Sequence, residues 1–228
     1  MTVGAARARR KATIMADRPA GNKPQQDVEN TSPPRPCCAG AVLRKTLSIL
    51  RRLFTFRLGT VVIYRHVELR SLTCPAEVRP VNEESIEDAL AMDDAGRVEN
   101  LRRAVGRGER AYFAYSGGKV VHRSLVQSGP GKAICELRVS FDLAEGEGYV
   151  HHSKTAPAMR GRGIYPAVLS RIAQDWRQRG RRLFIATVEA NEASMRGIEK
   201  AGFKLARRVA SLVWFGRCIL QKDLKVKQ

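Results

Sequence analysis

Four consecutive residues in the last third of the chain have the types and spacing of an anion-binding turn. The stretch AMRGRGIYPAVLSRI, residues 158–172, sets Arg160 and Arg162 beside Gly161 and Gly163 and then continues as an amphipathic helical pattern. The first amides of a helix lack partners within it, and the helix dipole adds positive charge there. Glycines let a phosphate approach the backbone, while arginines add charge and forked donors. The turn therefore predicts a site for a phosphorylated ligand, with a solvated, charged loop as the plain alternative.

Two common phosphate-binding motifs do not fit this turn. The sequence contains no GxxxxGK[ST] string, which a P-loop requires. A dinucleotide-binding GxGxxG motif would place Pro166 at its last position and would lie early in a βαβ unit. Here the turn comes late, after a predicted antiparallel hairpin, so another kind of phosphate site is expected.

The elements expected around the turn are mostly strands. Residues 110–127 read as a hairpin with its turn at Gly117-Gly118, and a helix over 166–179 should follow the arginine–glycine turn and stop at Gly180. Further strands are expected over 60–69, 77–81, 133–141, 147–156, 183–190 and 203–215, and further helices over 82–92, 98–105 and 191–202. This order predicts an α+β fold, with a mixed, mostly antiparallel sheet flanked by helices.

Charge and cysteine content restrict the partners and the compartment. The 228 residues carry a net charge of +19, which favours nucleic acid, acidic lipid or a polyanionic ligand, although a basic tail also raises the total. Five cysteines without a CxxC pair argue against a disulfide framework or zinc site and favour the reducing cytoplasm. Vicinal Cys37-Cys38 offers a soft-metal alternative, but no metal is expected. No apolar run reaches the roughly 18 residues of a transmembrane helix.

The chain divides by composition into three parts. Residues 1–40 are polar, basic and rich in proline and glycine, which predicts a disordered tail. Residues 41–76 are interpreted as an amphipathic helix over 42–58 and a lead-in strand. Leucines alternate there with Arg44, Lys45, Arg51 and Arg52, so the helix either packs on the following domain or contacts an acidic membrane surface. The main domain is placed at 77–228.

Two stretches in register resemble a known family. TAPAMRGRGIY and, further on, NEASMRGIEKAGF are similar to the GNAT superfamily of acyl-CoA-dependent N-acyltransferases, over residues 77–220. The positions that carry the resemblance are Pro157, Arg160, Gly163, Asn191, Lys200, Gly202 and Phe203. It implies a GNAT fold with acetyl-CoA as the acyl donor.

The resemblance also implies where coenzyme A would lie. The backbone of Gly161, Arg162, Gly163, Ile164, Tyr165 and Pro166 would face the pyrophosphate, although Pro166 has no N–H to give. Ser153, Lys154 and Thr155 would pair through their backbone with the pantetheine, and Asn191 would bond to it or cap the next helix. The strands ending at Thr155 and near Val188 would splay to admit it. Arg160, Arg162, Arg196 and Lys200 would supply cations.

The sequence departs from the family at the groups that move protons. Tyr165 stands at a usual Gly/Ala position, and Ile198 and Ala186 replace a common tyrosine acid and glutamate base. An amine with a pKa near 10.4 is mostly protonated at neutral pH, so a base is needed. The candidates are His151, His152 and Glu189, and strand alternation should turn only one of the two histidines into the cleft. Tyr112, Tyr115 and Tyr149 are expected to be ordinary sheet aromatics, and Trp176 to pack its helix onto the sheet.

The expected function is N-acetyl transfer from acetyl-CoA to a small-molecule or protein amine by direct attack, in the cytoplasm. The alternative is a non-catalytic module on the same scaffold that binds acyl-CoA or nucleic acid. The missing tyrosine and glutamate motivate this alternative, together with the positive charge.

Overall fold

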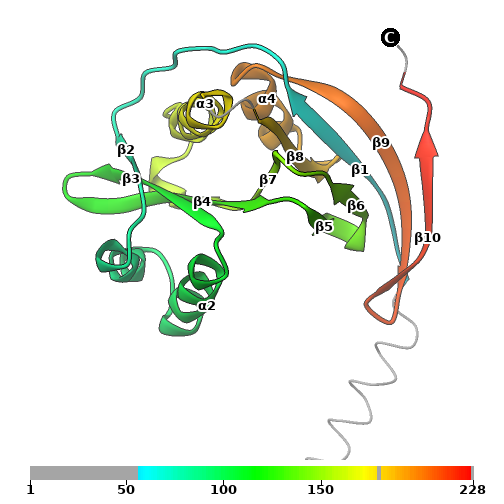
Figure 1. The fold of residues 1–228 in the computed structure, drawn as a ribbon, viewed down its shortest axis with the longest axis horizontal. Coiled ribbons are helices and arrows are strands. Elements are labelled where there is room, and N and C mark those ends of the chain that lie inside the picture. The colour runs from blue at the N-terminus through cyan, green and yellow to red at the C-terminus, as the bar shows by residue number, and fades with distance from the viewer. Residues whose placement is uncertain (1–55, 179–180, 227–228) are drawn as a thin grey trace, which may run out of the picture. The chain divides into compact units, whose positions relative to one another are not determined.

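A computed structural model describes residues 56–178 and 181–226. Its centre is an eight-stranded sheet in the order β10-β9-β1-β8-β7-β4-β3-β2 (Figure 1). These strands are β1 Phe56–His66, β2 Glu77–Pro80, β3 Arg110–Ser116, β4 Lys119–Ser128, β7 Glu147–Thr155, β8 Arg182–Val188, β9 Phe203–Trp214 and β10 Arg217–Leu224. No helix in the described residues is long and apolar enough to cross a membrane.

Helices cover both faces of the sheet. On one face, here the α3 face, lie α3 (Ile164–Arg177) and α4 (Glu192–Lys200), preceded by the short 3-10 helix η3 (Pro157–Met159). On the other, the α2 face, lie η1 (Glu84–Ala91) and α2 (Ala95–Gly106). The ribbon β5 (Gly131–Ile134) and β6 (Ser140–Leu143), joined by the 3-10 helix η2 (Glu136–Arg138), covers the α2 face near β8, β1 and β9 (Figure 1). The predicted α+β class, a mixed sheet flanked by helices, is confirmed.

The sheet is antiparallel except between β7 and β8. These two strands pair in parallel only from Glu147 to Val150 on β7 and from Arg182 to Ile185 on β8. Beyond those positions each strand continues without the other. β7 stays bonded to β4 on its far side, and β8 to β1. The two strands therefore part in the middle of the sheet.

The first described strand lies inside the sheet. β1 pairs with β8 along one edge and with β9 along the other. The boundary placed at residue 77 is therefore wrong, because it cuts off a central strand, and the folded domain already includes Phe56. The helix expected over 42–58 falls outside the described residues except for 56–58, which belong to β1. The tail predicted over 1–40 also lies outside them.

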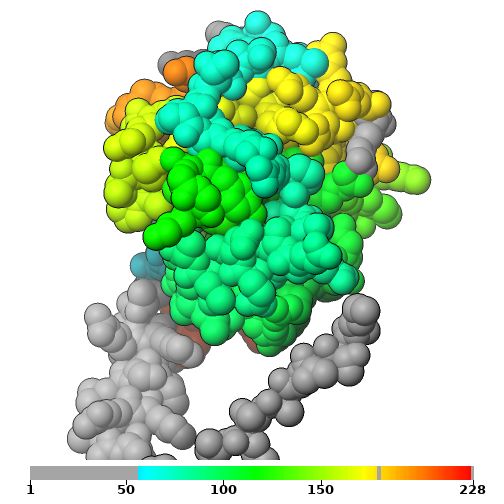
Figure 2. Space-filling model, turned by 90° about the vertical axis from the view of Figure 1, so that its left-hand side faces the viewer, coloured from blue at the N-terminus to red at the C-terminus, as the bar shows by residue number. Residues whose placement is uncertain are grey.

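The segment between β1 and β2 lies against α3. Ser170 of α3 donates a hydrogen bond to the carbonyl of Arg70, and Leu72, Cys74 and Ala76 pack on the core beneath. Figure 2 shows this segment in cyan beside the yellow α3. The segment between β1 and β2 therefore helps to hold α3 against the sheet.

Most elements match the expected ones, with three differences. The hairpin turns at Gly117-Gly118 as predicted, and Trp176 packs its helix on the sheet, where a Cβ on Gly148 would lie 2.6 Å from its ring. The strand expected over 133–141 is instead broken by η2. Helix α3 starts two residues early, at Ile164, and β10 was not predicted.

Candidate functional site

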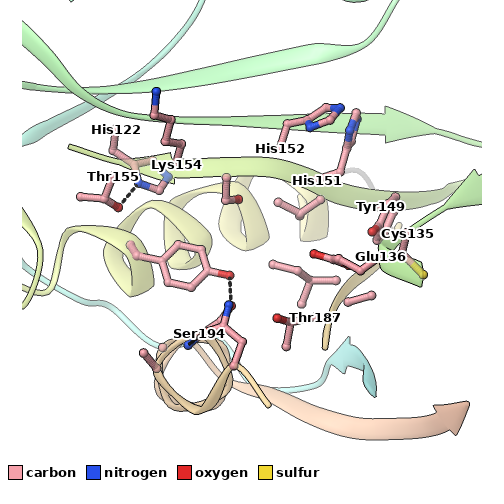
Figure 3. A pocket seen from close by; sticks show the side chains of 18 of the residues that line it. His122, Cys135, Glu136, Tyr149, His151, His152, Lys154, Thr155, Thr187 and Ser194 are labelled. Atoms are coloured by element: carbon pink, nitrogen blue, oxygen red, sulfur yellow. Dashed lines mark hydrogen bonds between the residues drawn. The ribbon is translucent and has the colours of Figure 1, made fainter. Parts of the chain in front are cut away.

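A cavity of about 1740 Å³ opens where β7 and β8 part. At one end its walls come from the start of α3 and from α4, on the α3 face. At the other end they come from η2 and the β9–β10 turn, on the α2 face. Figure 3 shows side chains of β7, η2 and α4 converging on this space. The cavity therefore connects the two faces through the gap in the sheet.

The α3 end of the cavity presents a run of open backbone donors. The amides of Gly161, Arg162, Gly163, Ile164 and Tyr165 make no hydrogen bond within the described part of the chain. Gly161 and Gly163 have φ values of +76° and +73°, and a Cβ on either would meet nothing within 4 Å. The turn thus needs glycine for its left-handed backbone and not for packing space. Successive amides of this kind form an anion-binding concavity at a helix N-terminus.

Cationic side chains stand beside these amides. Arg160, Arg196 and Lys200 line the cavity, while Arg162 is exposed and does not. Arg160 donates to the carbonyl of Thr155 at 3.4 Å, and Arg196 pairs with Glu192 at 3.2 Å. Three of the four predicted cations therefore line the cavity.

Tyr165 turns away from the open amides and onto α4. Its hydroxyl lies 3.2 Å from Oγ of Ser194, and its ring covers Gly197, where a Cβ would lie 2.7 Å from Cδ1. Burial raises the pKa of Tyr165 to about 12, so the hydroxyl keeps its proton at neutral pH. The bulky residue at a usual Gly/Ala position is thus accommodated by a glycine on the neighbouring helix.

The edge of β7 along the cavity exposes unpaired backbone groups, whereas its side-chain hydroxyls are already hydrogen-bonded. Past Val150 this edge has no partner strand among the described residues. The side chains of Ser153 and Thr155 are already engaged. Oγ of Ser153 lies 2.8 Å from Oγ of Ser124, and Oγ1 of Thr155 lies 2.7 Å from Nδ1 of His122. An extended ligand could therefore pair with this edge as an added strand would.

His122 links these hydroxyl groups into one hydrogen-bonded series. It is fully buried, with Nε2 2.8 Å from Oγ of Ser124. Burial, with a smaller contribution from the charge of Arg123, lowers the pKa of His122 to about 3. The ring is therefore neutral at all moderate pH values and bonds to a hydroxyl through each nitrogen.

Asn191 is the N-cap of α4, and its side-chain oxygen accepts from the amide of Ser194 at 3.1 Å. It also lines the cavity. Since the cap uses the amide oxygen, the side-chain NH₂ remains for a ligand, and the two expected roles are compatible.

The histidines on β7 depart from strand alternation. His152 has φ +50°, and the β4–β7 register shifts next to it, which marks a bulge. The prediction that only one histidine faces the cleft is therefore wrong. Both line the cavity with ring centroids 4.9 Å apart, and Figure 3 shows both rings on the side of β7 away from Ser194.

The surroundings of the two histidines differ. Nε2 of His151 lies 2.9 Å from a carboxylate oxygen of Glu109. Burial, followed by the charge of His151, lowers the pKa of His152, which keeps that ring neutral at pH 7. Lys154 instead forms an ion pair with the buried Asp93 at 2.7 Å, so its ammonium group is already engaged.

Glu189, the third candidate base, is not in the cavity wall. Its carboxylate forms an ion pair with Arg208 at 2.5 Å, and its amide bonds to Thr60 of β1. The position of Glu189 just past β8 suggested the cleft from sequence, but the strand leans toward β1 there. Glu189 is therefore not placed to act as a base in the cavity.

The cavity contains a carboxylate that sequence reasoning missed. Glu136 begins η2 and is the only acidic side chain in the cavity wall formed by the described residues. Figure 3 shows its carboxylate pointing into the space between β7 and Thr187. Partial burial in the cavity wall raises the pKa of Glu136, although its side chain still reaches solvent. The signal was a single acid within the apolar run 133–141, which was interpreted as an unbroken strand.

The loop that carries Glu136 is held in a costly conformation. The next two residues, Leu137 and Arg138, have φ values of +52° and +55°, which are unfavourable for side chains with a Cβ. Ser211 of β9 donates to the carbonyl of Leu137 at 2.8 Å and fixes the loop. Strained backbone of this kind is concentrated at functional sites.

Cys135 and Tyr149 stand beside Glu136 at the same end of the cavity. Burial raises the pKa of Cys135 to about 12 and raises that of Tyr149 further. Both groups therefore hold their protons at neutral pH. Tyr149, expected to be an ordinary sheet aromatic, thus contributes to the cavity wall.

Comparison with solved structures identifies this arrangement of sheet and helices. A GNAT-family acetyltransferase from Colwellia psychrerythraea superposes with a TM-score of 0.52 at 17% identity, over 80% of this chain and 62% of its own. A protein assigned to the same family from Novosphingobium aromaticivorans gives 0.51 at 17%, over 68% and 64%. The described domain has the GNAT fold.

The likeness is one of fold, at low sequence identity. A GCN5-related N-acetyltransferase-like protein from Streptococcus suis also shares the GNAT fold, with a TM-score of 0.50 at 14% identity over 75% of this chain and 67% of its own. The chain spans less than two thirds of the length of the first two structures. No protein-family model and no curated protein matches the sequence.

The pKa of His122 predicts how stability depends on pH. The unfolded side chain has a pKa near 6.5, and the folded one is at about 3, so protons bind the unfolded chain preferentially. The stabilisation is complete above about pH 6.5 and is lost as pH falls toward 3. From pH 6.5 to 5 the wild type should lose about 2 kcal/mol more unfolding free energy than His122→Gln. Urea unfolding at each pH measures this, and parallel losses would contradict it.

The contact between Tyr165 and Gly197 predicts a non-additive pair of substitutions. Glycine to alanine within a helix normally stabilises by about 1 kcal/mol. In the wild type Gly197→Ala should give no gain, because the new methyl group meets the ring of Tyr165. In a Tyr165→Ala background the full gain should return. Urea unfolding of the four proteins tests this, and an equal gain in both backgrounds would show that ring and glycine do not touch.

Proposed function

We propose that this protein is an acyl-CoA-dependent N-acyltransferase that transfers an acetyl group from acetyl-CoA to an amine. The observation that carries the proposal is the cavity through the parted strands, with open amides at its α3 end and one carboxylate at its α2 end. A phosphorylated acyl donor suits the amide-lined end, and a basic amine acceptor suits the end with the carboxylate. The GNAT fold supports the same reaction class.

Binding of the donor would use the backbone. The five open amides and the cations Arg160 and Lys200 suit a diphosphate. The unpaired edge of β7 suits an extended arm with amide groups, which the NH₂ of Asn191 can also reach from α4. The thioester would then lie where β7 and β8 begin to part, close to Glu136.

In this proposal Glu136 is the general base. It takes a proton from the ammonium of the acceptor, and the free amine attacks the thioester carbonyl. The C–N bond forms and the C–S bond breaks. The coenzyme leaves as a thiolate, which takes up, through water, the second proton that the attacking nitrogen loses. A raised carboxyl pKa strengthens the base and brings it closer to the working pH. His152, neutral at the same end, is the second candidate base.

Direct attack is favoured over an acyl-enzyme. Cys135, the cysteine in the cavity wall of the described domain, is held as a thiol by its raised pKa, and the thiolate is the nucleophilic form. We also propose that the protein works in the cytoplasm and that its acceptor is a small-molecule or protein amine.

Donor binding is tested at Gly163. Valine at φ +73° is strained, so Gly163→Val should turn the open amides away and abolish the rise in melting temperature that coenzyme A gives the wild type. Gly108→Val is the matched control, because Gly108 has φ +90°, equally open surroundings and a place outside the cavity wall. It should destabilise the fold similarly and keep the ligand-induced rise. An undiminished rise in Gly163→Val would contradict the placement of the diphosphate.

Catalysis is tested at Glu136 with acetyl-CoA, a panel of amines and release of free thiol as the readout. Glu136→Gln should lower kcat/KM about a hundredfold or more while leaving coenzyme A binding unchanged. Wild-type activity should fall as pH drops through the raised pKa of Glu136, since only the carboxylate accepts a proton.

Glu189→Gln removes a carboxylate of the same type outside the cavity and should keep wild-type activity. Full activity of Glu136→Gln would reject the base assignment. Tight binding of coenzyme A without turnover of any amine would favour a non-catalytic module.

A further inference from the structure

An apolar strip lies on the outer end of the sheet. Phe56 and Leu58 of β1 pair with Trp214 and Leu212 of β9, and Leu212 pairs in turn with Leu220 of β10. We call these five residues the apolar strip. Leu58, Leu220 and Phe56 are 78%, 57% and 59% exposed, and Phe56 stacks on Trp214 with ring centroids 5.7 Å apart.

The strip is on the α3 face but beyond the helices. Val62 and Tyr64, further along the same side of β1, pack in the core with α3 and α4. Figure 1 shows β1, β9 and β10 running past α4 at their far end. A contiguous exposed apolar surface of this kind marks a contact with a partner or a lipid.

Two basic residues of β10 border the strip. Arg217 is paired opposite Trp214, and Lys222 lies two residues beyond Leu220 on the same side of β10. Neither forms an ion pair with any described residue. The cross-strand rows of the strip contain no carboxylate.

The sequence that leads into the strip has the same character. Residues 43–55, LRKTLSILRRLFT, join directly to Phe56 and contain Arg44, Lys45, Arg51 and Arg52, with no acidic residue. Their apolar residues are leucine, isoleucine and phenylalanine. The folded edge and the adjoining sequence thus combine apolar bulk with positive charge.

We propose that the apolar strip docks on an anionic lipid surface. Phenylalanine, tryptophan and leucine enter the boundary of a bilayer, and basic side chains beside them bind anionic headgroups. A single apolar and basic segment binds a membrane weakly. The strip and residues 43–55, which directly precede it in the sequence, would together supply two such segments. The proposal stands whether or not the chain transfers acyl groups.

Three other occupants fit these features less well. A second copy would bring Arg217 and Lys222 against cations of another chain with a net charge of +19. Residues 43–55 folded onto the strip would add four more cations and no acid. Nucleic acid would satisfy the charges but would offer no apolar surface to Leu58 and Leu220.

The experiment is sedimentation of the full chain with vesicles of phosphatidylcholine, alone or mixed two to one with phosphatidylglycerol. The wild type should bind the mixed vesicles far better than the neutral ones, and salt should weaken that binding. Leu58→Ser with Leu220→Ser should bind the mixed vesicles about tenfold more weakly or worse. Leu90→Ser is the matched control, because Leu90 is 51% exposed on η1, off the strip, and should bind as the wild type does.

The charges are tested separately. Arg217→Gln with Lys222→Gln should weaken binding to the mixed vesicles only, whereas Lys119→Gln, at the β3–β4 turn, should not. Circular dichroism and melting temperature show whether each variant is folded.

Three results would overturn the proposal. The first is failure of the wild type to bind either vesicle. The second is equal binding by the strip variant and the wild type, which would leave residues 43–55 as the whole anchor. The third is a wild-type dimer that the strip substitutions convert to monomers without affecting vesicles, which would make the strip an interface between copies.

Discussion

The parting of β7 and β8 is the constraint on which the rest of the structure depends. Two neighbouring parallel strands stop pairing after Val150 and Ile185, in the middle of an otherwise continuous sheet. Unpaired backbone inside a protein is costly unless water or a ligand replaces the missing strand. The cost is contained because β4 keeps hold of β7 and β1 keeps hold of β8, so each half of the sheet remains rigid. A passage between the two faces exists because of this single interruption.

Several polar side chains around the gap are bonded to one another or drawn away from it. His122 and its hydroxyl partners satisfy one another, and Asp93 holds Lys154 and Arg123 back toward α2. Burial alone would raise the pKa of Asp93, but the bonds from Lys154 and Arg123 bring it below its usual value. Along β7 the side chains of Ser153, Lys154 and Thr155 are engaged elsewhere, which leaves the amides and carbonyls of this strand facing the opening. Such a wall suits a ligand with a repeating amide arm better than one recognised by its side groups.

Sequence patterns predicted the parts of this architecture that depend on local chemistry. The glycine turn, the helix behind it, the Asn191 cap and the hairpin at Gly117-Gly118 each follow from a few adjacent residues. The parts that depend on distant pairing were missed. Alternation misplaced the histidines because a bulge at His152 changes the phase of β7. Glu136 was hidden because the interruption of its strand depends on bonds to β9, far along the chain, and β1 was separated from the domain for the same reason.

The central place of β1 has a consequence for how the chain assembles. Val61 is paired with both Val188 and Val209, so the first strand of the described domain finds its partners only after nearly all of that domain has been made. Contacts of such long sequence separation form slowly, because closing the intervening loop costs entropy. Until then two open edges of an apolar strand remain exposed to other chains, a state prone to aggregation. One wall of the passage is therefore completed last during synthesis, when β8, β1 and β9 finally come together.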